Sequence, residues 1–378
     1  MIPNDPDDFE STIAVGPKRS AEAPRVHEVF GNYLVVIAGA DAGKHVEISD
    51  RPITIGRDPR QTLVFDDTQL SRLHARVSLV NGEVVAEDLK STNGTFLDGV
   101  RLTEPATMRE GQVLAVGGQL LTYERRSRRE IDRAEELDRD LQRASQYVFS
   151  LLPEAITSGL VRAHWRFVPS TQLGGDAFGY FWLDPHTFVF YLLDVSGHGA
   201  GSAMHSVTVL NVLRQRALPD VDFRNPAAVL TSLNTRFPMD GHGGLFFTMW
   251  YGVFDTSDRT LSYASAGHHP AFLVSPDRQS PHPLGLPALM IGAFGGCEYR
   301  VQQTTVPPGS MVYLFSDGVF EIVTRDKVRW ELANFLSLLS EPALPGVPEA
   351  ERLYRGVTQA SATTQLDDDF SLMVITLP

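Results

Sequence analysis

The sequence predicts two folded domains joined by a long helix: an all-β sandwich over residues 26–124, a helical linker over 125–152, and a larger domain of mixed strands and helices over 153–378. Three observations support this division. A length of 378 residues exceeds that of one ordinary domain. The first third alternates short strand-like runs with turn signals. A charge-rich segment without Gly or Pro then separates it from a region where strand and helix patterns mix.

The sandwich is predicted from its runs and turns. Residues 1–25 are rich in Pro, Asp and Ser and lack apolar periodicity, so we expect a flexible tail. Beyond them, runs such as YLVVIAG, ITIGR and VLAVGGQLLTYE alternate with turns. The Asn81-Gly82 step between two alternating runs is a strong signal for a β-hairpin. Many short strands and no long helix within about 90 residues predict a β-sandwich.

The linker predicted over 125–152 carries dense charge of both signs and ends before Pro153. Its apolar residues are spaced alternately three and four apart, as in a heptad seam: Ala134, Leu137, Leu141, Ala144, Val148 and Leu151. Two structures fit this seam, a single solvated helix between domains and a parallel dimeric coiled coil. We favour the coiled coil and therefore expect a homodimer through this helix.

The remaining residues alternate buried-strand patterns with amphipathic helices. FVFYLLDV, FFTMWYGVF, LSYASAG, MVYLFSD and FSLMVITL have the apolar character of buried strands. SAMHSVTVLNVLRQRAL, PAAVLTSLNTRF, RWELANFLSLLS and PEAERLYRGVTQAS carry apolar stripes at helical spacing. This pattern predicts an α+β or a layered α/β/α domain.

The formal net charge of −13 argues against two classes of partner. Binding to nucleic acid or to an anionic membrane surface needs clustered Lys and Arg. Cys297 is the only cysteine, so we expect no internal disulfide and no zinc–thiolate site. The first residues are acidic and polar, unlike a signal peptide, and no apolar run reaches the roughly 20 residues of a membrane span. We therefore expect a cytoplasmic protein without nucleic-acid or membrane partners.

Three loops of the predicted sandwich concentrate polar residues: GR with Arg57, SRLH beginning at Ser71, and STNGT with Asn93. Alternate loops of a sandwich gather at one end. There, a guanidinium supplies bidentate hydrogen bonds to a phosphate, and a hydroxyl adds a further donor. An Asn amide bonds the backbone of an extended peptide. These loops therefore predict a small anion-binding site.

Spaced as GR, SRLH and STNGTF, the three motifs resemble a forkhead-associated (FHA) domain over residues 26–124. The resemblance implies a site for a phosphothreonine peptide made of Arg57, Ser71, Arg72, Thr92 and Asn93. Within it, Arg57 and Ser71 contact the phosphate, and Asn93 holds the ligand backbone. By the same resemblance, His74 has a structural role and braces the loops.

The tail offers a candidate ligand for this site. Thr12 follows acidic residues at positions 7, 8 and 10. A phosphorylated Thr12 would dock onto the sandwich of the same chain or of a partner molecule. The alternatives are another phosphothreonine protein as the ligand, and a tail with no binding role.

Aspartates stand at the ends of apolar runs in the larger domain. Asp176 lies in LGGDAFGY, Asp194 ends FVFYLLD, Asp317 ends MVYLFSD, and residues 367–369 form DDD before FSLMVITL. Carboxylates that terminate buried strands converge readily at one edge of a sheet, and several together cannot all stay ionised without cations. Oxygen ligands without a His or Cys set favour Mg²⁺ or Mn²⁺ over zinc. Two bridged ions lower the pKa of a shared water.

The motifs GGD, DVSGHG, SDGV and DDDFS, in this order over residues 160–378, resemble the metal-dependent protein phosphatases of the PP2C type. They are more similar to the bacterial branch, the phosphatase domains of sporulation and stress-response sigma-factor regulators. This resemblance implies a layered α/β/β/α domain with two Mn²⁺ or Mg²⁺ ions. It also implies hydrolysis of phosphoserine or phosphothreonine in a protein such as an anti-sigma-factor antagonist.

The resemblance assigns roles to the acidic residues. The catalytic Asp194 bridges both ions, helped by the backbone carbonyl of Val195. Asp176 serves one ion, and Asp317 serves the other.

The second ion has a further ligand in the Asp run. This ligand is Asp368, with Asp369 as the alternative, because the run leaves the register open by one residue. His198 either protonates the leaving oxygen or braces the glycine loop.

One feature of the wider family is absent. Eukaryotic members carry a phosphate-gripping Arg near the first acidic motif, whereas this chain has STQL at 170–173, with Arg162 and Arg166 upstream. The residue that holds the substrate phosphate is therefore open. His268 and His269 are adjacent, and adjacent strand residues face opposite ways, so we expect structural roles for both.

Together, these motifs predict a protein serine/threonine phosphatase that is regulated or targeted through a phosphothreonine-binding domain. The alternative is a non-catalytic adaptor, in which a degenerate phosphatase fold only binds partners.

Overall fold

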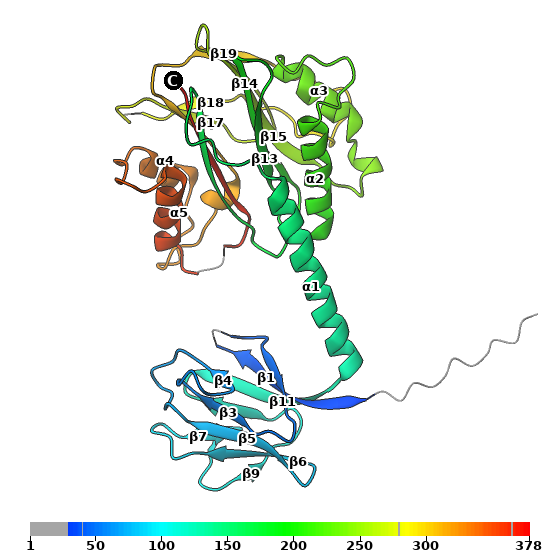
Figure 1. Ribbon diagram of the computed structural model, residues 1–378, viewed down its shortest axis with the longest axis vertical. Coiled ribbons are helices and arrows are strands. Elements are labelled where there is room, and N and C mark those ends of the chain that lie inside the picture. Colours follow the sequence, from blue (N-terminus) through cyan, green and yellow to red (C-terminus); the bar gives the residue numbers. More distant parts are fainter. Residues whose placement is uncertain (1–28, 40, 279, 364–365) are drawn as a thin grey trace, which may run out of the picture. The chain divides into compact units, whose positions relative to one another are not determined.

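The computed structural model describes residues 29–39, 41–278, 280–363 and 366–378, and it divides the chain into two compact units, Met1–Leu137 and Asp138–Pro378 (Figure 1). The predicted tail and Thr12 lie outside the described residues. Within the described ranges, no helix has the length and apolar character needed to cross a membrane.

The first unit is a sandwich of two β-sheets, as predicted. Its sheets have the strand orders β2-β1-β11-β10-β7-β8 and β4-β3-β5-β6-β9. Alternate residues of both sheets point inward and form one core, which includes Leu34, Ile55, Val77 and Leu114. The strands are β1 (Phe30–Ala38), β2 (His45–Glu47), β3 (Ile53–Gly56), β4 (Leu63–Val64), β5 (Ala75–Val80), β6 (Glu83–Asp88), β7 (Thr95–Leu97), β8 (Val100–Arg101), β9 (Ala106–Thr107), β10 (Val113–Val116) and β11 (Gln119–Ser127).

The hairpin predicted at Asn81-Gly82 is confirmed. These two residues connect β5 to β6, where Val80 pairs with Glu83. Both have positive φ angles, 52° for Asn81 and 84° for Gly82. Two positive φ angles are typical of the type I′ turn that joins twisted antiparallel strands.

Helix α1 (Arg128–Leu151) begins later than the predicted start at residue 125. Residues 124–127 continue β11 and pair with the first residues of β1, from Phe30 to Tyr33. The predicted boundary was wrong here because the ladder of β1 extends the strand into a charged stretch whose local pattern is helical.

Part of the apolar seam of α1 packs against other residues of the same chain. In the second unit, Val148 and Leu141 pack against Leu173 and Ala203. Leu137, by contrast, is 60% exposed. Within one chain, the later seam residues of α1 therefore cover the larger domain, and Leu137 stays exposed.

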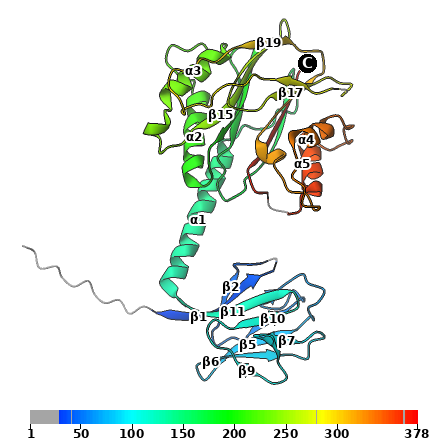
Figure 2. The same cartoon turned by 180° about the vertical axis from the view of Figure 1, so that it is seen from behind.

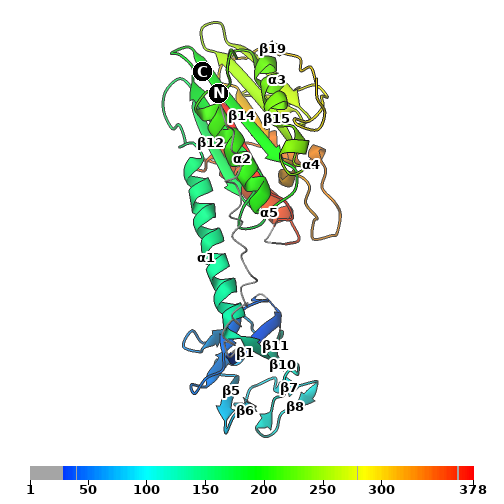
Figure 3. The same cartoon turned by 90° about the vertical axis from the view of Figure 1, so that its right-hand side faces the viewer.

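The second unit has four layers, which confirms the predicted α/β/β/α domain. Its two sheets have the orders β13-β14-β15-β16-β19 and β12-β21-β20-β17-β18. Helices α2 and α3 cover the first sheet, and α4 and α5 cover the second (Figures 2 and 3). The strands are β12 (Arg162–Val168), β13 (Ala177–Trp182), β14 (Thr187–Val195), β15 (Phe247–Asp255), β16 (Thr260–Ala266), β17 (Ala271–Val274), β18 (His282–Leu284), β19 (Gln302–Thr305), β20 (Met311–Phe315) and β21 (Phe370–Thr376). The helices are α2 (Ala200–Arg214), α3 (Pro226–Arg236), α4 (Leu332–Leu339) and α5 (Glu349–Ala360), with short 3₁₀ turns η1 (Met239–Gly241) and η2 (Asp317–Val319).

Strand β14 shows why the apolar runs are continuous. Phe188, Phe190 and Leu192 point into the core between the two sheets. Val189 and Leu193 point to the opposite face, where they meet α2 and α3. Because both faces of the strand are covered, every position needs an apolar residue, up to the aspartate at its end.

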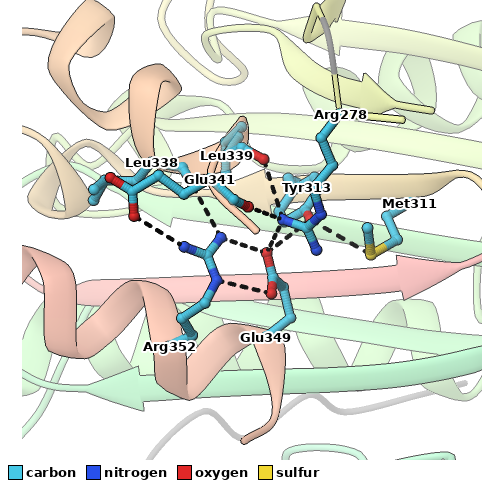
Figure 4. Close-up of polar contacts among 8 residues, drawn as sticks. All are labelled: Arg278, Met311, Tyr313, Leu338, Leu339, Glu341, Glu349 and Arg352. Carbon is cyan, nitrogen blue, oxygen red and sulfur yellow. Dashed lines mark hydrogen bonds and ion pairs between the residues drawn. The ribbon is translucent and has the colours of Figure 1, made fainter. Parts of the chain in front are cut away.

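A buried ion-pair network fastens α5 to the second sheet (Figure 4). Glu349 Oε1 accepts hydrogen bonds from Arg278 Nη1 at 2.9 Å, Arg352 Nη2 at 2.7 Å and Tyr313 Oη at 3.1 Å. Arg352 Nη2 also donates to the carbonyl oxygen of Leu338 at 2.9 Å. The network therefore joins α5 to α4, to β20 and to the loop that follows β17.

Candidate functional site

The structure brings the first two polar loops of the sandwich into contact. The backbone N–H of Arg57 donates to the carbonyl oxygen of Ser71 at 3.1 Å, and that of Asp58 donates to Arg72 at 3.1 Å. A Cβ atom on Gly56 would lie 2.3 Å from the carbonyl oxygen of Arg72. Only glycine allows the two loops to approach so closely.

The third loop joins the same cluster. The backbone N–H of Thr92 donates to Ser71 Oγ at 3.1 Å, and Thr92 Oγ1 lies 3.4 Å from that oxygen. Asn93 Nδ2 donates to the carbonyl oxygen of Gln69 at 2.8 Å. The side chains of Arg57 and Arg72 are exposed on the adjoining loops. All five residues of the predicted phosphopeptide set therefore lie on three connected loops.

His74 is completely buried and connects these loops through hydrogen bonds. Its Nδ1 accepts a hydrogen bond from the backbone N–H of Ser71 at 3.1 Å. With Nδ1 as acceptor, the neutral ring carries its proton on Nε2 and donates to the carbonyl oxygen of Gly94 at 3.1 Å. The structural role predicted for His74 agrees with these two bonds.

In the second unit, the predicted carboxylates gather where strands end. Asp194 is the penultimate residue of β14, Asp176 precedes β13, Asp317 begins η2 after β20, and Asp368 precedes β21. Burial, together with the charges of Asp317 and Asp368, raises the pKa of Asp194 to about 7. Burial and the charge of Asp368 raise the pKa of Asp317 to about 6. These side chains are therefore close enough to repel one another.

Asp176 is the most enclosed member of the group, with 2% of its surface exposed. Burial raises its pKa well above the usual range, and the charges of Asp194 and Asp369 add to this effect. Its Oδ2 is buried and has no hydrogen-bond partner among the described residues. A buried carboxylate beside other carboxylates needs a cation to stay ionised, so these residues fit a divalent ion.

A backbone oxygen completes this environment. A Cβ atom on Gly175 would lie 2.9 Å from the carbonyl oxygen of Val195. This oxygen therefore faces the loop that carries Asp176. In the part of the chain that the structure describes, no three Asp, Glu, His or Cys side chains lie close enough together to hold a metal ion. Mg²⁺ usually takes only one or two carboxylates and keeps several waters, so it needs no such group of three.

The two candidates in the Asp run have different surroundings. Asp369 is buried, and its Oδ1 accepts from the backbone N–H of Ser170 at 2.8 Å and from Ser170 Oγ at 2.9 Å. Its Oδ2 accepts from the backbone N–H of Gly175 at 2.6 Å. Asp368 is exposed. Asp369 therefore anchors the loop before Asp176, while Asp368 faces the solvent beside Asp194.

The predicted histidines have separate positions. His198 is exposed on the loop between β14 and α2. Burial raises the pKa of Asp368, and His198 has a smaller, lowering effect on it.

For the pair in AGHHP, the expectation of opposite faces was wrong. His268 and His269 lie between β16 and β17, and their rings are 4.3 Å apart. The segment has left the strand, so strand alternation does not apply. Burial lowers the pKa of both rings, for His269 to about 4, which agrees with neutral, structural residues.

Two contributors were not foreseen from the sequence. Ser170 anchors Asp369 through its backbone and side chain. Glu321 follows Asp317 by one helical turn, and its charge adds to the effects of burial and Asp368 in raising the pKa of Asp317. The spacing of Glu321 within SDGVFE was the one signal for it.

Comparison with known proteins matches both units. The family "Stage II sporulation protein E (SpoIIE)" matches residues 184–378, and the family "FHA domain" matches residues 53–117. Phosphoserine phosphatase RsbU of Bacillus subtilis (strain 168) is 28% identical over 209 residues, which are 55% of this chain and 61% of RsbU. The FHA domain-containing protein FhaB of Mycobacterium tuberculosis (strain H37Rv) is 41% identical over 85 residues, 22% of this chain and 55% of FhaB. This chain thus spans less than two thirds of these relatives.

A solved structure supports the fold of the larger unit. The SiaA-PP2C domain of Pseudomonas aeruginosa superposes with a TM-score of 0.56 at 18% sequence identity, covering 65% of this chain and 98% of that domain. This similarity shows a PP2C fold. Because the SpoIIE match spans more than half of the 378 residues, the chain belongs to the SpoIIE family, with an FHA domain ahead of its PP2C-type domain.

Proposed function

We propose that this protein is a metal-dependent phosphatase of phosphoserine or phosphothreonine proteins in bacterial signalling. The observation that carries the proposal is the buried carboxylate of Asp176, whose Oδ2 has no hydrogen-bond partner within the described ranges, among carboxylates whose pKa values are raised by burial and mutual repulsion. Such a group is costly unless cations neutralise it. The family and the relative named phosphoserine phosphatase point to the same chemistry.

We infer that two Mn²⁺ or Mg²⁺ ions are held by five residues: Asp176, Asp194, the carbonyl of Val195, Asp317 and Asp368. Both carboxylate oxygens of Asp369 already accept hydrogen bonds from backbone N–H groups. This supports Asp368 as the metal ligand. When bound, the ions supply an activated water and neutralise charge on the phosphoryl group. His198, which is exposed on the glycine loop after β14, is proposed to donate a proton to the leaving oxygen or to brace that loop.

The sandwich is proposed to bind a phosphothreonine peptide. The exposed side chains of Arg57 and Arg72, next to the hydroxyl of Ser71, offer charge-assisted hydrogen bonds to a phosphate. The ligand is a phosphothreonine protein or the phosphorylated Thr12 of the chain itself. Binding would regulate the phosphatase domain or tether its substrate.

This part is tested by titrating a phosphothreonine peptide into the full chain. Arg57→Ala should weaken binding at least about tenfold, because a hydrogen bond to a charged group is lost. Arg109→Ala, at an exposed arginine on the loop between β9 and β10, is the matched control. Equal weakening by both changes would contradict a specific site at Arg57.

A homodimer through α1 is a further part of the proposal. It rests on Leu137, which is 60% exposed at a seam position, with Ala134 exposed one step earlier in the seam. Sedimentation of the full chain should show a dimer that Leu137→Asp converts to a monomer. A wild-type monomer at micromolar concentration would refute it.

The catalytic part is tested by Mn²⁺-dependent release of phosphate from phosphoserine and phosphothreonine proteins. An anti-sigma-factor antagonist is the substrate that the sigma-factor branch of the family suggests. Asp194→Asn should lower the rate by about 100-fold or more, because metal stabilisation of the transition state is worth several kcal/mol. If the wild-type chain and Asp194→Asn both release phosphate at a negligible rate, only the adaptor function remains.

A further inference from the structure

A positively charged hairpin follows the carboxylate cluster directly in the chain. It spans residues 322–330 and is closed by hydrogen bonds from Trp330 N to Ile322 O at 2.9 Å and from Thr324 N to Val328 O at 2.9 Å. Ile322 is buried at its base. Lys327 has a φ of 59°, which turns the chain at the tip. The hairpin is therefore anchored at one end and exposed at the other.

The exposed part of this hairpin carries a local excess of positive charge. Arg325, Lys327 and Arg329 are exposed, and Asp326 is the acidic residue among them. The chain as a whole has a net charge of −13. A phosphate monoester, which is a dianion near neutral pH, is repelled by such a chain except where cations gather. This hairpin is such a place, and it begins five residues after Asp317 in the chain.

Glu321 connects the hairpin to the carboxylates. Its backbone N–H donates to the carbonyl oxygen of Asp317 at 2.8 Å. Its side chain forms an ion pair with the guanidinium of Arg329. Burial is the largest cause of the raised pKa values of Asp317 and Asp368, and the charge of Glu321 contributes to both. Glu321 thus links Arg329 to the turn that carries Asp317.

Arg166, upstream of the first acidic motif, is less suited to this task. Arg166 lies with its guanidinium 4.5 Å from the centre of the Tyr354 ring, and its Nε is 3.9 Å from Glu351. These contacts hold it against α5. Arg329, in contrast, is 68% exposed in an ion pair with a Glu321 side chain that is 43% exposed. The pair uses Nη2, and a guanidinium has five N–H donors, so Arg329 can also bind a phosphoryl group while Glu321 positions it.

We propose that Arg329, positioned by Glu321, binds the phosphoryl group of the substrate at the edge of the carboxylate cluster, in the role for which the STQL segment offers no arginine. The proposal rests on the phosphatase function proposed above. A planar guanidinium matches two phosphoryl oxygens, and Arg325 and Lys327 add attraction for the approaching dianion. Arg329 is thus a substrate-binding residue, and Glu321 is a positioning residue.

The test compares Arg329→Gln with Arg355→Gln in the Mn²⁺-loaded full chain. Arg355 is a matched control, because it is 57% exposed and pairs with Glu351 on α5. Inorganic phosphate is the competitive inhibitor, and p-nitrophenyl phosphate is the substrate. Arg329→Gln should raise the Ki of inorganic phosphate about tenfold, since a charge-assisted hydrogen bond is lost. Arg329→Lys should give an intermediate Ki, because it keeps the charge and loses the fork geometry.

The possible outcomes distinguish a failure of the role of Arg329 from a failure of the phosphatase function. If the wild-type chain hydrolyses p-nitrophenyl phosphate and Arg329→Gln leaves the Ki of phosphate unchanged, the role of Arg329 is wrong and the phosphatase function stands. If Arg355→Gln raises the Ki as much as Arg329→Gln, the effect is general electrostatics and the specific contact is wrong. If the wild-type chain hydrolyses nothing, the proposed function itself fails. Binding of inorganic phosphate, followed by titration calorimetry, then tests Arg329 without turnover.

Discussion

Replacement of Arg352 by methionine should destabilise the second unit strongly. The Arg352 side chain is 5% exposed and forms hydrogen bonds to both oxygens of Glu349 and to the carbonyl of Leu338. Breaking a buried ion pair by removing one partner costs about 3–5 kcal/mol, because the other charge stays buried. Glu349 keeps Arg278 at 2.9 Å and Tyr313 at 3.1 Å. We therefore expect the low end of the range, about 3 kcal/mol.

Urea unfolding followed by tryptophan fluorescence measures this loss in one unit alone. All four tryptophans of the chain lie in the second unit: Trp165, Trp182, Trp250 and Trp330. Arg355→Met, at an exposed ion pair on the same helix, should cost less than about 1 kcal/mol. If Arg352→Met also costs less than about 1 kcal/mol, the network does not fasten α5 and this reasoning is refuted.

Two further predictions concern the site loops. Gly56→Ala places a methyl group against the carbonyl oxygen of Arg72, so it should lower the free energy of unfolding by about 1–3 kcal/mol and abolish phosphopeptide binding. Thermal unfolding and peptide titration measure the two effects. An unchanged Tm would contradict the contact. Asp369→Asn should destabilise the fold by about 1–3 kcal/mol, because the new NH2 group replaces one of two acceptor oxygens and leaves a buried N–H donor without a partner. Asp368→Asn should leave urea unfolding nearly unchanged and weaken Mn²⁺ binding; the reverse pattern would exchange the roles of the two aspartates.

Local sequence patterns predicted the elements that shape each core. Strand β14 is apolar along its length because both faces are covered, and the Asn81-Gly82 turn needs two positive φ angles. Pro226 and Asn225 mark the start of α3, where Asn225 Oδ1 accepts from the backbone N–H of Ala228 at 3.2 Å. In each case, the determining physics lies within a few residues of sequence.

Tertiary contacts decided what the local pattern left open. The register of the Asp run follows from Ser170, which lies 199 residues away in the chain and takes one oxygen of Asp369. Helix α1 starts late because the preceding residues pair with β1. A helical sequence pattern carries no information about this pairing. His268 and His269 lie side by side because the chain leaves the strand at residue 266. Sequence spacing predicted the carboxylates of the cluster, but it did not predict that Asp369, rather than Asp368, is buried.

The central claim is that the carboxylates around Asp194 bind divalent ions. Isothermal titration of Mn²⁺ into the metal-free full chain measures this without turnover. The wild-type chain should bind two ions, and Asp194→Asn should lose at least one of them with unchanged urea unfolding. Equal uptake by both proteins, or no uptake by either, would contradict this claim.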